Sequence, residues 1–205
     1  MTPLISDQSA NIGVMPRPAN PDVRRRLLEA GLELVHAHGF AASGVKDITE
    51  KAGVPKGSFY AYFASKEAFA AAVLRHYWAD IEDRILPILD TAGPAAERIT
   101  RFFHALADEH EATDFLLGCL VGNLSLELGA SSDLVRAELV DILDRWDAAL
   151  AECVRSSHVS SDLDAGRVAG LLIEAWEGAA LRGKVTRDRA PYDRFEAVTV
   201  PALLR

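Results

Sequence analysis

The segment from residue 45 to residue 66, VKDITEKAGVPKGSFYAYFASK, constrains the fold more than any other part of the chain. Ile48 and Ala52 are four residues apart and therefore share one face of a first short helix. Gly53 supplies the positive φ that lets the chain leave that helix. Phe59 and Phe63 have the same spacing and anchor a second helix. The segment therefore predicts two short helices joined by a tight turn, a helix-turn-helix.

The side chains left over in this segment are of the types that contact phosphates and base edges of DNA. They are Lys46, Lys56, Ser58, Tyr60, Tyr62 and Lys66. A helix that enters the major groove presents its N-terminal residues to the base edges, so Lys56, Gly57 and Ser58 are the expected base readers. Gly57 would let the backbone approach closely.

Residues 20–78 resemble the DNA-binding domain of the TetR family of bacterial regulators. The A-G-V turn, the Y-x-Y-F helix and the S-K that opens the next helix carry the resemblance. It implies that Lys46 is a further base reader and that Tyr60, Tyr62 and Lys66 hold phosphates. For Tyr60 and Tyr62 the alternative is that the rings pack within the domain.

Composition agrees with a globular DNA-binding protein. The chain has 205 residues, of which 49% are hydrophobic, and can bury a real core. Residues 1–68 hold eight Lys or Arg and seven Asp or Glu, whereas residues 69–205 hold fourteen and twenty-three. The negative charge thus lies away from the helix-turn-helix, and screening confines its effect to about 10 Å. With no membrane-spanning stretch and no signal pattern, a cytoplasmic location with reduced cysteines is expected.

Helical signals recur along the whole chain and no strand pattern appears, so the expected fold is all-α. Residues 1–19 have no period and are expected to be a disordered arm. Asn20 and Pro21 start a helix, and Ser65 caps a long one. These signals predict a three-helix helix-turn-helix domain over residues 20–66 and a C-terminal helical bundle over residues 67–205. The resemblance to the TetR family implies that this bundle serves ligand binding and dimerisation.

The second domain is expected to contain four long helices. One helix starts after Gly93-Pro94, and an apolar one runs from residue 115 to residue 128. Ser131 or Ser132 caps the third, and Ser161 opens the last. Residues 197–204 predict a short terminal helix or loop.

The last two long helices carry apolar stripes that could join two subunits. A single reading head buries little surface, so a homodimer that reaches two half-sites of double-stranded operator DNA is expected. In the TetR family the late helices form a four-helix bundle between subunits, and an intrachain core is the alternative use of the same residues. The stripes are Val135, Leu139, Ile142, Trp146 and Leu150 on one helix and Val168, Leu172 and Ala179 on the other.

The segments FLLGCLVGNLSLELG and EAWEGAALRGKV are similar to the NemR and AcuR branch of the family. That resemblance implies a small-molecule effector, either a reactive electrophile or a small unsaturated acid. Cys119 and Asn123 are four residues apart and share one face of the apolar helix. An unpaired amide costs roughly 1–3 kcal/mol in hydrocarbon, so Asn123 must bond to backbone, a side chain or a ligand. Trp176 and Glu177 could line the same site, and the alternative for Trp176 is that it belongs to the core.

Two chemistries are open for Cys119. It could be a small buried hydrophobe. It could instead be a reactive thiol, which needs a nearby cation such as Arg101, His104 or Arg182 to lower its pKa. A third possibility is reversible binding of an anionic metabolite by the same cations.

An all-α carboxylate metalloenzyme is the competing class of function. Such bundles use Glu-x-x-His on inward faces, and this motif is absent. No P-loop, dinucleotide fingerprint or nucleophile elbow is present either. The sequence therefore predicts no metal, no cofactor and no catalytic residue.

Overall fold

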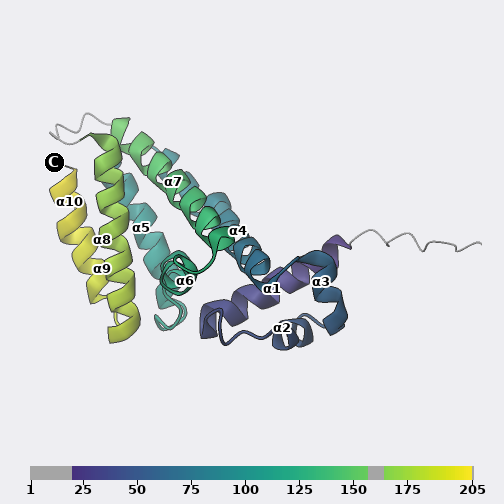
Figure 1. Ribbon diagram of the computed structural model, residues 1–205. Coiled ribbons are helices and arrows are strands. Elements are labelled where there is room, and N and C mark those ends of the chain that lie inside the picture. Colours follow the sequence, from purple (N-terminus) through teal and green to yellow (C-terminus); the bar gives the residue numbers. More distant parts are fainter. Residues whose placement is uncertain (1–19, 157–163, 205) are drawn as a thin grey trace, which may run out of the picture.

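The computed structural model describes residues 20–156 and 164–204 (Figure 1). Within these ranges the ordered elements are helices and no strand occurs, which confirms the all-α prediction. The arm expected over residues 1–19 lies outside the described residues.

The N-terminal head consists of α1 (Pro21–His38), α2 (Val45–Lys51) and α3 (Phe59–Tyr62), with the 3₁₀ turn η1 (Lys56–Ser58) before α3. The Asn20 side chain caps α1 by accepting a hydrogen bond from the backbone of Asp22 at 2.9 Å. Gly53 has a φ of 64°, as predicted for the turn. The 3₁₀ turn η1 follows Pro55 and contains Gly57, whose low helix propensity disfavours a regular α-helical turn there.

Aromatic packing holds the head together. Phe59 is fully buried, and its ring lies 5.5 Å from that of Phe63 and 5.0 Å from that of Phe69 on the next helix. Gly31 of α1 faces the same ring of Phe69, so α1 and α4 can approach closely. The two short helices are therefore fixed to a rigid support.

Helix α4 (Lys66–Arg84) runs from the head into the larger C-terminal part, where the turn η2 (Leu86–Asp90) leads to α5 (Ala95–Glu111). The Ser65 side chain caps α4 by accepting from the backbone of Ala68 at 3.0 Å, as predicted. Helix α5 starts directly after Gly93-Pro94, also as predicted.

The apolar helix expected over residues 115–128 is shorter in the structure. Helix α6 spans Leu120–Leu128, and Cys119 is its N-cap residue rather than an interior residue. Residues before it form a loop in which Phe115 and Gly118 have φ of 56° and 65°. An apolar run does not by itself distinguish a buried helix from a buried loop, and this is why the predicted boundary was wrong.

The long helices α7 (Asp133–Arg155) and α8 (Ala165–Thr186) pack against each other, and α9 (Ala190–Arg194), a π-helical turn (Phe195–Thr199) and α10 (Val200–Leu203) cover α8 (Figure 1). Ser132 caps α7. Asp164 caps α8 by accepting from the backbone of Gly166 at 2.9 Å, and the predicted start at Ser161 lies outside the described residues.

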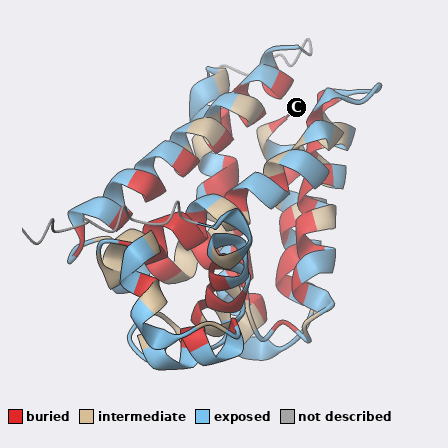
Figure 2. Ribbon diagram, turned by 90° about the vertical axis from the view of Figure 1, so that its right-hand side faces the viewer, coloured by how far each residue is buried: buried red, intermediate tan, exposed pale blue. Residues whose placement is uncertain are grey.

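The stripes expected at a subunit interface are buried inside the single chain. Buried positions follow the inner sides of the helices (Figure 2), and Trp146 of α7 lies 5.3 Å from Trp78 of α4, ring to ring. Every residue of the two stripes, from Val135 to Ala179, is buried. The intrachain alternative is therefore correct for these side chains, because the same core must hold α4 and α5.

Candidate DNA interface and effector cavity

The expected base readers lie on the open side of the head. Lys56 and Gly57 are exposed, Ser58 is half-buried, and a side chain at position 57 would meet nothing within 4 Å. Tyr60 is 62% exposed although its ring lies edge-on to Phe59. These residues project from a turn that is held from behind by buried phenylalanines.

The other residues expected to contact DNA already have partners within the protein. Lys46 is exposed and lies 3.6 Å from a carboxylate oxygen of Glu50. The hydroxyl of Tyr62 accepts a hydrogen bond from the backbone of Asn20 at 3.1 Å. Lys66 Nζ donates to the carbonyl oxygen of Phe40 at 2.6 Å and lies 4.2 Å from the centre of that ring. Tyr62 and Lys66 thus also have structural roles, fixing the start and the end of α1.

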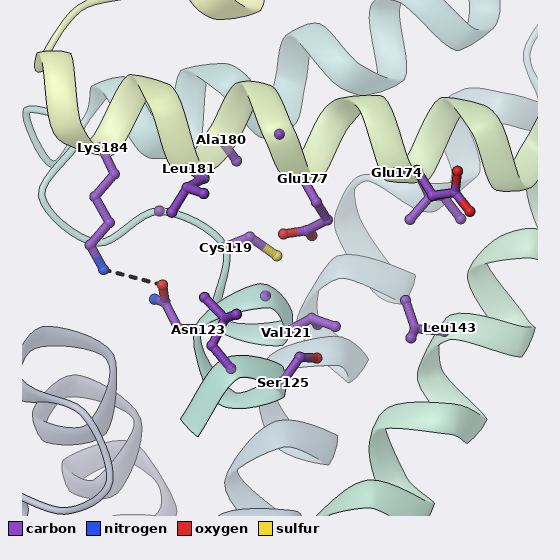
Figure 3. Close-up of a pocket in the computed structure, with 15 residues that line it drawn as sticks. Cys119, Val121, Asn123, Ser125, Leu143, Glu174, Glu177, Ala180, Leu181 and Lys184 are labelled. Atoms are coloured by element: carbon purple, nitrogen blue, oxygen red, sulfur yellow. Dashed lines mark hydrogen bonds between the residues drawn. The ribbon is translucent and has the colours of Figure 1, made fainter. Parts of the chain in front are cut away.

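A cavity of about 380 Å³ lies between α6, α7 and α8, and Cys119 is one of its lining residues (Figure 3). We call it the Cys119 cavity. The wall is mainly apolar, and its polar side chains come from α6 and α8 (Figure 3). The main lining side chains are those of Cys119, Val121, Asn123, Ser125, Leu126, Leu143, Ile173, Glu174, Glu177, Leu181 and Lys184.

One end of the cavity is a hydrogen-bonded pair. Lys184 Nζ donates to Oδ1 of Asn123 at 3.2 Å and to the carbonyl oxygen of Leu117 at 3.0 Å (Figure 3). Asn123 Nδ2 donates to the same carbonyl oxygen at 2.9 Å. The amide of Asn123 is therefore paired with backbone and side chain, as its apolar setting requires.

The Cys119 thiol faces the carboxylate of Glu177 (Figure 3). Burial and this carboxylate raise the pKa of the thiol well above its usual value. Burial also raises the pKa of Glu177, whose Oε1 atom is buried without a hydrogen-bond partner. The lowered pKa that the reactive-thiol alternative requires is not found, because an anionic group and not a cation lies beside the sulfur.

A second cavity of about 250 Å³ lies between the head and the C-terminal part. We call it the His36 cavity. Its lining includes His36 of α1, Tyr77 of α4 and His110 of α5, and Gly118 lines both cavities. Burial lowers the pKa of His36 and lowers that of His110 to about 4, so both rings are neutral near pH 7.

The head is attached to both ends of α6. His36 Nε2 lies 2.8 Å from the carbonyl oxygen of Gly118, just before α6. At the other end, the carboxylate of Glu127 accepts hydrogen bonds from the backbone N–H groups of Phe40 at 2.8 Å and Ala41 at 2.6 Å. These contacts join α6, which lines the Cys119 cavity, to the C-terminal end of α1.

Comparison with known proteins identifies the family to which a chain of this architecture belongs. Residues 27–73 match the tetR family of bacterial regulatory proteins, and residues 95–198 match the C-terminal domain of LmrA/YxaF-like transcriptional regulators. The chain is 38% identical to the HTH-type transcriptional repressor DhaR of Mycobacterium sp. strain GP1, over 91% of this chain and 94% of DhaR. It belongs to the TetR family.

Other relatives agree with this assignment. The TetR-family chain is 34% identical to the transcriptional regulator AcuR of Cereibacter sphaeroides, over 93% of each chain. The crystal structure of reduced Escherichia coli NemR superposes with a TM-score of 0.78 at 27% identity, covering 90% of this chain and 98% of NemR. The protein is thus a transcriptional regulator and not an enzyme, and regulators of this family bind DNA and effectors and act as dimers.

The three cations expected beside Cys119 do not line its cavity in this TetR-family structure. Arg101 donates to Thr91 and to the carbonyl oxygen of Ala92. His104 lies 3.0 Å from a carboxylate oxygen of Glu196. Arg182 lines a separate open groove beside α9. Which residues lie beside Cys119 depends on how distant helices pack, and spacing along the sequence does not predict that packing.

Trp176 is also outside the Cys119 cavity. It is buried, with its ring 5.1 Å from Phe103 and 5.3 Å from Tyr192, and is therefore a core residue. Sequence reasoning missed Lys184 as the cation of the cavity, although it lies in the same segment as Trp176. Its helical spacing of seven residues from Glu177 was the available signal.

Among residues 20–156 and 164–204, no three His, Cys, Asp or Glu side chains form a group that could hold a metal ion. No described helix has the length and apolarity needed to cross a membrane.

Proposed function

We propose that this protein is a repressor that binds operator DNA as a dimer and is released when a small molecule occupies the Cys119 cavity. The proposed boundary between the DNA-binding head and the effector domain is residue 66, where α4 begins. The observation that carries the proposal is the attachment of α6 to both the cavity and the head.

In the head, Lys56, Gly57 and Ser58 would read base edges, with Lys46 as a further reader. Tyr60 would contact phosphates, and Tyr62 and Lys66 would contact the backbone of DNA next to their present partners. The exposure of Lys56 and Tyr60 supports this assignment. The open space around Gly57 would allow the protein backbone to approach the groove.

The lining of the cavity favours a small acid with a short apolar body. A carboxylate could pair with Lys184 Nζ and accept from Nδ2 of Asn123, while leucine, valine and isoleucine side chains surround the remainder. Glu174 and Glu177 lie farther along α8 and would repel a second negative charge. We therefore propose reversible binding of a monoanion.

Occupancy would be transmitted by α6. A ligand that engages Asn123 must compete for its bonds to Lys184 and Leu117, next to the loop that His36 holds. A shift of this loop or of Glu127 would move α1. DNA half-sites are about 34 Å apart, so a small displacement of each head weakens binding to both. By linkage, DNA must weaken effector binding by the same factor.

Covalent addition at Cys119 is the second candidate, with an electrophile or an unsaturated acid as effector. The position of Glu177 favours it, because this carboxylate could accept the thiol proton as sulfur bonds to the β-carbon of an unsaturated acid. The electron pair of the double bond would then take a proton at the α-carbon, returning Glu177 to its starting state. The raised thiol pKa makes this step slow without such a base.

A mobility-shift assay on the DNA upstream of the protein's own gene tests the proposal. Acrylate, a small unsaturated monoanion, is added to the wild type, Cys119→Ser, Lys184→Met and the matched control Cys153→Ser. Reversible binding predicts that only Lys184→Met loses the response, whereas covalent addition predicts that only Cys119→Ser does and that a mass increment appears. Absence of any shift by the wild type at every salt concentration would reject DNA binding at this site.

A further inference from the structure

The His36 cavity is lined by acidic groups and by hydrogen-bond acceptors, and no lysine or arginine in the described part of the chain lines it. Its wall contains three carboxylates, two imidazoles and one phenol, and leucine and isoleucine side chains fill the rest. The main polar lining residues are Glu33, His36, Tyr77, Asp80, Glu109 and His110. This lining is opposite in charge to the Lys184 end of the Cys119 cavity.

The three carboxylates lie where the cavity meets solvent. The side chains of Glu33, Asp80 and Glu109 are 65%, 52% and 49% exposed. Arg84 pairs with both Asp80 and Glu109, and Lys51 pairs with Glu33. Three negative charges are therefore paired with two positive ones. The mouth keeps a net negative charge, which attracts cations.

Two imidazoles with free lone pairs lie deeper in the cavity. The hydroxyl of Tyr192 donates to the carbonyl oxygen of Ala180 at 3.5 Å, so it accepts from Nδ1–H of His110 at 2.9 Å. Nε2 of His110, a residue that is only 5% exposed, is left with a lone pair that no described residue donates to. Nε2–H of His36 donates to Gly118, and its Nδ1 lone pair is free in the same way.

We propose that the His36 cavity binds a small organic ammonium ion, whose N–H groups donate to the imidazole lone pairs of His36 and His110. A buried acceptor without a donor is costly, and an ammonium group consists of donors only. The ring of Tyr77 adds an aromatic face for the cation. A metal ion needs more ligands, and no three His, Cys, Asp or Glu side chains in the described ranges form such a group. The inference goes beyond the proposed function, which uses only the Cys119 cavity.

The size of the cavity fits an arylalkyl amine. A dry cavity of about 150 Å³ is sufficient for benzene, and the His36 cavity has about 250 Å³. Helix α1 contributes Glu33 and His36 to its wall, whereas α5 contributes Glu109 and His110. A bound ion therefore contacts the head and the C-terminal part at once and fixes their relative position.

One positive charge opposes this binding. Lys184 lies behind Gly118 in the wall of the Cys119 cavity. Burial is the main cause of the lowered pKa of His36 and His110, and the charge of Lys184 adds to it. Lys184→Met should therefore strengthen binding of an ammonium ion about twofold to fivefold. Weaker binding in this variant would contradict a cation in the cavity.

Isothermal titration calorimetry of the full chain with benzylammonium, without DNA, tests the site. Benzyl alcohol has the same shape and no charge, so it should bind at least about tenfold more weakly. Glu33→Gln should weaken benzylammonium binding about fivefold, the effect of one unit charge at about 4 Å in water. Glu29→Gln is the matched control, one turn earlier on α1 and also paired with a cation. It should change the affinity less than about twofold.

Nitrogen NMR of the histidine side chains locates the ligand. The ring nitrogens of His36 and His110 should shift with benzylammonium, whereas those of the exposed His38 should not. Resonances of His36 and His110 that stay in place would overturn the site, as would equal affinity for the amine and the alcohol or equal effects of the two glutamine variants. Loss of operator binding or of the response to acrylate would instead reject the proposed function, since neither DNA nor acrylate is present in this titration.

Discussion

His36 of α1 and Gly118 of the loop before α6 are joined by a 2.8 Å contact between the imidazole Nε2 and the carbonyl oxygen. The two residues are 82 positions apart in sequence. Since the ring is neutral near pH 7, its Nε2–H donates and Nδ1 carries no proton. The contact gives the loop that holds Cys119 a direct connection to the DNA-binding head, independent of α4.

Glu127→Gln should loosen the other connection. Its carboxylate accepts two backbone hydrogen bonds, and an amide can accept both only through one neutral oxygen. We expect amide exchange of Phe40 and Ala41 to accelerate roughly tenfold, with a loss of about 1–2 kcal/mol in unfolding free energy. Exchange measured by NMR checks this. Glu152→Gln on α7 is the control, and unchanged exchange at Phe40 would contradict the clamp.

Acid should destabilise the fold through His110. Its pKa is about 4 in the folded protein because it is buried, against about 6.5 when unfolded, so the unfolded chain binds the proton more tightly. The contribution of the neutral, buried His110 to the free energy of unfolding is fully present above pH 6.5 and is lost as pH falls toward 4. The loss from pH 7 to pH 5 is about 2 kcal/mol. Urea unfolding at both pH values should show a smaller loss in His110→Gln but the wild-type loss in His38→Gln, which replaces an exposed histidine.

Lys56→Ala should weaken operator binding by about 1–3 kcal/mol and relax base preference, because this residue is expected to face the bases. Lys46→Ala tests whether that lysine reads bases or only neutralises a phosphate. If Lys46 contacts only a phosphate, its replacement should weaken binding to all DNA sequences alike. It should also reduce the slope of log affinity against log salt concentration by about 1. Fluorescence anisotropy at several salt concentrations separates these cases. Lys51→Ala is the control, since Lys51 is held by Glu33 at 2.6 Å, and equal effects in all three variants would contradict the assignment.

Both thiols of the native protein should react slowly with a disulfide reagent such as DTNB. Cys119 and Cys153 are buried, and burial raises the pKa of each thiol. We expect rates at pH 7.5 at least about tenfold below that of a free cysteine, rising to the free rate in urea. Glu177→Gln separates two roles of the adjacent carboxylate: reaction of Cys119 should accelerate where the charge of Glu177 only raises the thiol pKa, and should slow where Glu177 accepts the thiol proton. Immediate reaction of one native thiol would show that the cavity admits reagent to a reactive sulfur.

Local chemistry made much of the fold predictable. Asn20, Ser65 and Ser132 cap helices as expected, because a side-chain oxygen satisfies backbone donors wherever a helix starts. Gly53 takes the positive φ that its turn demands. The loop before Cys119 was not predictable, since Phe115 adopts a positive φ that its residue type disfavours.

The candidate effector site was only partly predictable. Cys119, Asn123 and Glu177 do line one cavity, as expected, but Lys184, the partner of Asn123, was not predicted and comes from a helix more than fifty residues away. Which residues of α8 face α6 depends on the packing of the whole bundle. For the same reason periodicity marked the apolar stripe of α7 without deciding whether its partner is the chain itself or a second copy.

Gly118 connects the two cavities. Its peptide forms part of the wall of the Cys119 cavity and of the His36 cavity, and its φ of 65° suits glycine. A side chain there would also press on Lys184, whose Cδ lies 3.1 Å from the site of the added carbon. Two compounds, one in each cavity, would therefore act on a shared partition, and each would change the measured affinity of the other.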